Sequence, residues 1–131
     1  MSKENVDEKG KTRTLIIEGV FARLIIETGP EKGKEFLIDK PCVTIGRHLE
    51  NDVCLSYDEK ISRFHGRISF IKDEEVYYYE DLNSTNGTTI CNKWFKNGRV
   101  KIKHGNRILI GKGIQLGFFT KKPGLMDWLL G

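Results

Sequence analysis

Short apolar runs recur along this chain from Leu15 onward, and Gly, Pro, Asn and Asp separate them. None of the runs continues into an apolar period of about 3.6 residues, the pattern that indicates an amphipathic helix. Many short strands at such spacing are typical of a sandwich, so we predict an all-β fold, an antiparallel β-sandwich of about 11 strands. The expected strands are Ala22–Thr28, Lys34–Ile38, Cys42–Ile45, Asp52–Leu55, His65–Ile71, Val76–Glu80, Thr88–Cys91, Arg99–Lys103, Ile108–Ile110 and Gln115–Phe119.

Composition divides the chain into one domain with a segment at each end. The 131 residues, 38% of them hydrophobic, suffice for one domain with a buried core. Residues 1–14 are polar and without periodicity, so we expect a flexible tail. Residues 15–21 are either an extra edge strand or a linker, 22–120 form the domain, and 121–131 are a short apolar tail. That tail either packs on the sandwich or binds a partner.

Charge and cysteine content limit the partners. Lys and Arg outnumber Asp and Glu by 22 to 18, a mild excess that suits an anionic peptide and does not demand nucleic acid. No apolar run approaches a membrane span and the start is no signal peptide, so we expect a cytoplasmic protein without a membrane partner. Cys42, Cys54 and Cys91 lack metal-ligand spacing and are interpreted as reduced core thiols.

Three motifs follow one another on this strand background. Gly46-Arg47 ends one apolar run, and Ser62-Arg63-Phe64-His65 opens another. The third motif, Ser84-Thr85-Asn86-Gly87, is short and hydroxyl-rich, and its Asn-Gly pair predicts a tight turn. The gaps between the motifs suit loop–strand–loop excursions that return to one end of a sandwich, where a rigid scaffold usually carries function.

The chemistry of these side chains suits a phosphate group. Arg47 offers a planar, permanently charged fork and Arg63 a second cation. Ser62 and Thr85 offer hydroxyl donors, while the Asn86 amide both donates and accepts. A phosphate on a side chain presents nearly two negative charges and three acceptor oxygens to such groups.

The order of these motifs resembles the forkhead-associated (FHA) domain, the phosphothreonine-binding module, over roughly Ala22 to Thr120. The resemblance implies that Arg47, Ser62, Arg63 and Thr85 contact the phosphate and that Asn86 bonds the main chain of the ligand. It further implies a structural role, without ligand contact, for the residues that support the site, Gly46, His65 and Gly87. Phe64 departs from the family pattern, because a basic residue often stands at this position.

The resemblance implies a non-catalytic phosphothreonine-peptide-binding module, a signalling adaptor in Ser/Thr kinase pathways whose partners are phosphothreonine-containing proteins. An enzyme is not expected, since Ser62 and His65 lack an oxyanion motif and an acid partner. The three histidines show no metal-cage spacing, and no cofactor or metal is expected. The alternative is a phosphate-independent adaptor that binds through the sandwich surface or the apolar C-terminal tail.

Thr12 and Thr14 lie in the basic segment just before the domain. Some small bacterial members of the family carry a phosphorylatable threonine in such a tail, which then occupies their own binding site. A tethered phosphate sees its site at an effective concentration of millimolar order, enough to outcompete micromolar partners. The alternative is a plain solvated tail.

Overall fold

Alternating burial along each strand defines an inner and an outer face in both sheets. In the computed structural model, β5 (Gly66–Ile71) and β6 (Val76–Asp81) bury every second side chain, as expected for strands with one face on a core. The structure describes residues 22–120. The predictions for 1–14 with Thr12 and Thr14, for 15–21 and for 121–131 lie outside the described residues.

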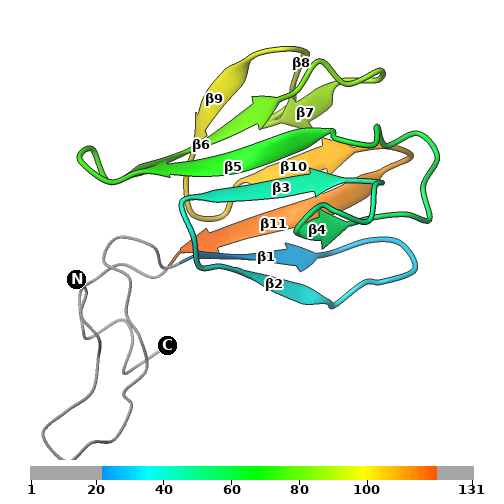
Figure 1. The fold of residues 1–131 in the computed structure, drawn as a ribbon, viewed down its shortest axis with the longest axis horizontal. Coiled ribbons are helices and arrows are strands. Elements are labelled where there is room, and N and C mark those ends of the chain that lie inside the picture. Colours follow the sequence, from blue (N-terminus) through cyan, green and yellow to red (C-terminus); the bar gives the residue numbers. More distant parts are fainter. Residues whose placement is uncertain (1–21, 121–131) are drawn as a thin grey trace, which may run out of the picture.

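The strands form two sheets that pack face to face (Figure 1). One sheet has the order β2-β1-β11-β10-β7-β8 and the other the order β4-β3-β5-β6-β9. The remaining strands are β1 (Ala22–Ile26), β2 (Glu35–Ile38), β3 (Cys42–Gly46), β4 (Val53–Cys54), β7 (Thr88–Ile90), β8 (Lys93–Phe95), β9 (Arg99–Ile102), β10 (Arg107–Ile110) and β11 (Ile114–Thr120).

Side chains from both inner faces make one core. Leu24 and Phe118 from the first sheet and Ile45, Ile68 and Tyr79 from the second are fully buried in it. The all-β sandwich predicted from the strand pattern is therefore confirmed. No helix occurs between residues 22 and 120, so this part of the chain has none that is long and apolar enough to cross a membrane.

Three details differ from the sequence-based prediction. Strand β8 was not predicted; Cys91 and Asn92 before it have positive φ (53° and 64°) and form the hairpin turn that leads into it. The pair β3–β4 is parallel, against the otherwise antiparallel ladders. The cysteines are not core thiols: they are free, Cys91 is exposed, and Cys42 and Cys54 are half-buried.

The loops that carry the three motifs meet at one end of the sandwich. In Figure 1 the loops β3–β4, β4–β5, β6–β7 and β10–β11 lie together on the right. The first and last described residues, Ala22 and Thr120, pair with each other at the opposite end. Loops from both sheets thus build a single surface.

Candidate functional site

The β6–β7 loop is organised around the buried carboxylate of Asp81, the last residue of β6. Its Oδ1 accepts from the backbone N of Ser84 (2.8 Å) and of Asn97 (3.0 Å). Its Oδ2 accepts from the hydroxyls of Ser84 and Thr88, both at 2.7 Å. Burial opposes the charged form, but these hydrogen bonds together outweigh it and hold the pKa of Asp81 below its ordinary value. An ionised carboxylate therefore fixes both ends of the loop.

The turn closes at Gly87, which has a φ of +80°, a conformation that favours glycine. The Gly87 backbone N donates to Ser84 Oγ at 2.8 Å. A Cβ at Gly87 would also lie only 2.4 Å from the indole of Trp94. Both the φ and the close approach therefore require glycine here.

The imidazole of His65 joins this loop to the one that carries Ser62. The side chain is fully buried; its Nδ1 accepts from the Ser62 backbone N (3.1 Å), and its Nε2 faces the Gly87 carbonyl at 2.9 Å. Because the Ser62 N–H can only donate and the carbonyl can only accept, the proton is assigned to Nε2. Burial lowers the pKa of His65 more than the Gly87 carbonyl and Asp81 raise it, so the ring is neutral.

The β3–β4 loop is hydrogen-bonded to the β4–β5 loop, which carries Ser62, through the backbone carbonyl of Arg63. That oxygen accepts from the His48 backbone N at 3.1 Å and from Asn51 Nδ2 at 2.7 Å. The same Asn51 nitrogen also donates to the His48 carbonyl at 2.9 Å. A Cβ at Gly46 would lie 2.2 Å from the Arg63 oxygen, so the two loops approach this closely only because position 46 is glycine.

Arg47 lies at the start of the β3–β4 loop, half-buried. Its backbone N donates to the Ser62 carbonyl at 3.0 Å, and its Nε donates to the Ile61 carbonyl at 2.8 Å. Within residues 22–120, its terminal guanidinium nitrogens have no hydrogen-bond or ion-pair partner. The side chain is thus oriented by Nε and keeps two donor groups for an anion.

The hydroxyl of Ser62 and the β6–β7 loop contact each other directly. Ser62 Oγ accepts from the Thr85 backbone N at 2.9 Å, which leaves the hydroxyl hydrogen for another acceptor. Asn86 Nδ2 donates to the Lys60 carbonyl at 2.9 Å, so its Oδ1 and second N–H stay available. Arg63, Thr85 and Asn86 are exposed.

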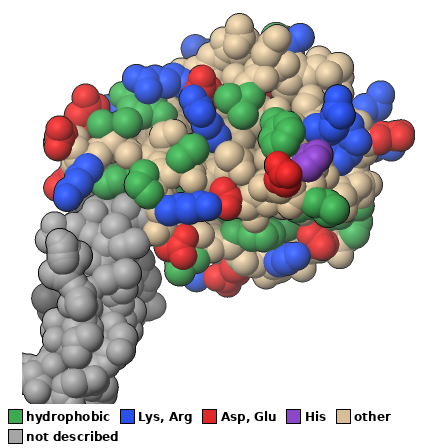
Figure 2. Space-filling view, in the orientation of Figure 1, with side chains coloured by type: hydrophobic (Ala, Val, Ile, Leu, Met, Phe, Trp, Pro, Cys, Tyr) green, Lys and Arg blue, Asp and Glu red, His purple; other side chains and the backbone are tan. Residues whose placement is uncertain are grey.

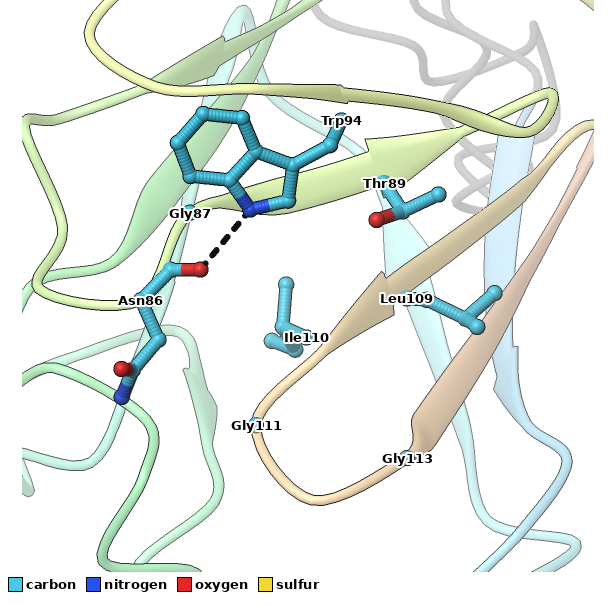
Figure 3. Close-up of a pocket in the computed structure, with 8 residues that line it drawn as sticks. All are labelled: Asn86, Gly87, Thr89, Trp94, Leu109, Ile110, Gly111 and Gly113. Atoms are coloured by element: carbon cyan, nitrogen blue, oxygen red, sulfur yellow. Dashed lines mark hydrogen bonds between the residues drawn. The ribbon is translucent and has the colours of Figure 1, made fainter.

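A hollow of about 210 Å³ adjoins this loop on the outer face of the first sheet. Figure 3 shows Trp94 from β8 over one side of it, its indole N–H directed at the Asn86 carbonyl, 3.0 Å away. The Asn86 side chain points away from the hollow (Figure 3). Trp94 thus supports the backbone of the β6–β7 loop at Asn86.

The structure therefore brings Arg47, Ser62, Arg63, Thr85 and Asn86 to one end of the sandwich, with Gly46, His65 and Gly87 between their loops. Sequence reasoning missed the contributions of Asp81, Asn51 and Trp94. An acidic residue three positions before a serine is a turn pattern that could have indicated Asp81. Nothing in the sequence indicated Trp94, because its strand β8 has only three residues, too few to show a strand period. No cluster of three or more metal-ligating side chains occurs among the described residues.

Comparison with known proteins identifies the class that this fold and site define. The family model of the FHA domain matches residues 43–111, more than half of the chain, and the chain belongs to this family. A solved structure from a structural and functional analysis of phosphothreonine-dependent FHA domain interactions superimposes with a TM-score of 0.67. It is 25% identical and covers 78% of this chain and 98% of its own.

Two curated relatives are regulators by name. The oxoglutarate dehydrogenase inhibitor of Corynebacterium efficiens is 38% identical over 91 residues, 70% of this chain and 61% of its own length. The glycogen accumulation regulator GarA of Mycolicibacterium smegmatis is 33% identical over 99 residues, 76% of this chain and 59% of its own length. The chain thus spans about three fifths of the curated relatives it matches.

Proposed function

We propose that this FHA domain is a non-catalytic module that binds phosphothreonine peptides and acts as a signalling adaptor in Ser/Thr kinase pathways. The observation that carries the proposal is the convergence of Arg47, Ser62 and Asn86 from three loops, each with hydrogen-bonding groups left for a ligand. The family and the regulatory names of the relatives support it. The cytoplasmic location stays a prediction.

In the proposed complex the phosphate lies between Arg47 and Arg63. The terminal nitrogens of Arg47 donate to two phosphate oxygens, since a guanidinium fork matches this geometry. The Ser62 hydroxyl donates to a third oxygen, with Thr85 alongside. The free Oδ1 and N–H of Asn86 bond a peptide group of the ligand main chain, which aligns the segment across the loops.

Preorganisation strengthens such a site. The neutral His65 ring and the ionised Asp81 fix the backbone of two loops before any ligand arrives. Ordering these loops therefore adds little to the entropic cost of binding. In this account His65, Gly46 and Gly87 position the contacting residues without touching the ligand.

The alternative, a phosphate-independent adaptor, predicts binding that does not respond to phosphorylation. The mixed surface in Figure 2, where Lys and Arg side chains are interspersed with Asp and Glu, gives no continuous basic face on that side for nucleic acid.

An oriented peptide library containing either phosphothreonine, phosphoserine or threonine, screened against the purified chain, tests the proposal. Selection of phosphothreonine peptides supports it, whereas equal capture from all three libraries contradicts it.

Self-regulation through the N-terminal segment is part of the proposal. A phosphate on Thr12 or Thr14 would compete for the same site from within the chain. Phosphorylation in vitro, followed by titration with an external phosphopeptide, measures this competition. A lower apparent affinity after phosphorylation supports the switch, and unchanged affinity rules it out.

A further inference from the structure

Exposed apolar side chains gather on the outer face of the first sheet, beside the hollow shown in Figure 3. Of the five large apolar side chains that are exposed between residues 22 and 120, three lie on this face: Leu37, Trp94 and Leu109. Trp94 is 62% exposed and Leu109 36%, and Thr89 of β7 pairs with both of them. Trp94, Thr89 and Leu109 are named here the outer patch. Apolar side chains gathered in this way mark an interaction site, whereas single ones need no explanation.

A strongly apolar segment of the chain follows this same sheet. The described part ends at Thr120, the last residue of β11. Beyond it the sequence contains Leu125-Met126-Asp127-Trp128-Leu129-Leu130, in which every residue but Asp127 is apolar, and burial of such side chains is favourable. Pro123-Gly124, just before this run, is the pair that type II turns prefer at their two central positions. The sequence therefore favours a reversal of the chain between β11 and the apolar run.

The path of a returning segment is limited by the position of β11 in the sheet. Strand β11 lies between β1 and β10 (Figure 1), so a segment that returns along it lies over a face of the sheet. The inner face is filled by the core, which leaves the outer face. Leu109 pairs with Gln115, roughly 17 Å back from Thr120 at the rise of an extended strand. The apolar run from Leu125 to Leu130 spans about the same length when extended, so it can reach the outer patch.

We propose that the segment 125–130 folds back over the outer face of the first sheet and packs on the outer patch. Its last two leucines then lie against Leu109 and the indole of Trp94. The same indole supports the β6–β7 loop, since its N–H donates to the Asn86 carbonyl at 3.0 Å and a Cβ at Gly87 would lie 2.4 Å from it. The docked segment thus covers a side chain on which this loop rests. The docking does not depend on the proposed function, because it is argued from apolar side chains and chain geometry alone.

The two tryptophans of the chain, one in the outer patch and one in the segment, allow a direct test. In full-length Trp128→Phe, Trp94 is the only tryptophan, and quenching of its fluorescence by acrylamide measures how much of the indole is open to water. Adding Leu129→Ser/Leu130→Ser should raise the quenching constant about twofold, as expected when a cover over half of a large aromatic ring is lost. The control Lys121→Ser/Lys122→Ser changes the same segment outside the apolar run and should leave the quenching unchanged. None of these substitutions alters residues 22–120, so the sandwich stays intact.

The reverse arrangement tests the location. In Trp94→Phe, Trp128 is the only tryptophan, and adding Leu109→Ser should increase its quenching. The control Leu49→Ser should not, because Leu49 is an exposed leucine of the β3–β4 loop, outside the outer patch. The inference is overturned if Trp94 is quenched equally with and without the two leucines, or if Trp128 does not respond to Leu109→Ser. Protection that grows with protein concentration also overturns it, because the segment then packs on a second copy of the chain.

Discussion

At the scale of single residues, the site depends on which donor groups are used within the protein and which are left free. Arg47 uses Nε on the Ile61 carbonyl, so its fork is oriented before a ligand binds. Lysine has no equivalent of Nε and presents a single ammonium on a flexible stem. A positive charge at position 47 is therefore not sufficient for full phosphate affinity, because the orientation of the guanidinium also matters.

Replacing Arg47 by alanine should weaken phosphopeptide binding by about 1.5–3 kcal/mol, the range for a hydrogen bond to a charged group. Arg47→Lys should restore only part of this loss. Isothermal titration measures both, with Arg67→Ala as the control, because Arg67 is an exposed arginine on β5 that pairs with Glu80. Parent-like binding by Arg47→Ala would show that the anion site is elsewhere.

The second residue-scale prediction concerns His65 and pH. Its pKa in the folded protein lies below the ordinary value of 6.5, so the unfolded chain takes up the proton first as pH falls. The free energy of unfolding should therefore decrease as pH drops below 6.5, by at most about 1.4 kcal/mol per pH unit.

Urea unfolding between about pH 8 and pH 5 measures this slope. His65→Gln should be less stable at every pH but should lack the contribution of His65 to the slope. Identical slopes in the parent and the variant would mean that His65 is not held neutral.

At the scale of elements, the sequence predicted the tight turn of the β6–β7 loop but not the short strand β8, whose Trp94 supports that loop. The Asn86-Gly87 pair indicated a tight turn, and Gly87 does have a positive φ. Strand β8 has only three residues, too few to show a period, and follows a Cys91-Asn92 turn that does not match the usual Asn-Gly type. For this reason the contact between Trp94 and the loop could not be foreseen.

Trp94→Phe keeps an aromatic ring on Gly87 but removes the indole N–H that donates to the Asn86 carbonyl. We expect a loss of about 0.5–1.5 kcal/mol in phosphopeptide affinity, the usual worth of one hydrogen bond. Titration of Trp94→Phe with and without Asn86→Ala gives a double-mutant cycle. If Trp94→Phe weakens phosphopeptide binding as much in the Asn86→Ala background as in the parent, the indole does not act by positioning the Asn86 side chain.

Gly46→Ala tests the close approach of the β3–β4 loop to the β4–β5 loop at the Arg63 carbonyl. The added Cβ would lie 2.2 Å from the Arg63 carbonyl, so the loops must separate. Overpacking of this kind costs about 1–3 kcal/mol of unfolding free energy, and affinity should fall as well. Gly98→Ala is the control, since a Cβ there meets nothing closer than Phe95 at 4.0 Å. Thermal unfolding that is equal for the two variants would contradict the close approach.

At the scale of the whole molecule, the strand pattern was enough to predict the sandwich, and motif order was enough to predict that the loops meet at one end. What the sequence could not supply was the long-range polar network beneath them. Asp81 reaches Asn97, and His65 reaches Gly87, through hydrogen bonds that leave no periodic pattern in the sequence. Such contacts depend on the final register of both sheets, which local propensities do not determine.

The most direct test of the central claim is the affinity of one peptide in three forms, with threonine, phosphothreonine or phosphoserine at the same position. Phosphothreonine should bind clearly, threonine not measurably, and phosphoserine more weakly by about 0.8 kcal/mol or more, since it lacks one methyl. Isothermal titration of all three against the parent chain gives the answer. Equal affinity for threonine and phosphothreonine would contradict the account, and equal affinity for the two phosphopeptides would reduce the site to a general phosphate binder.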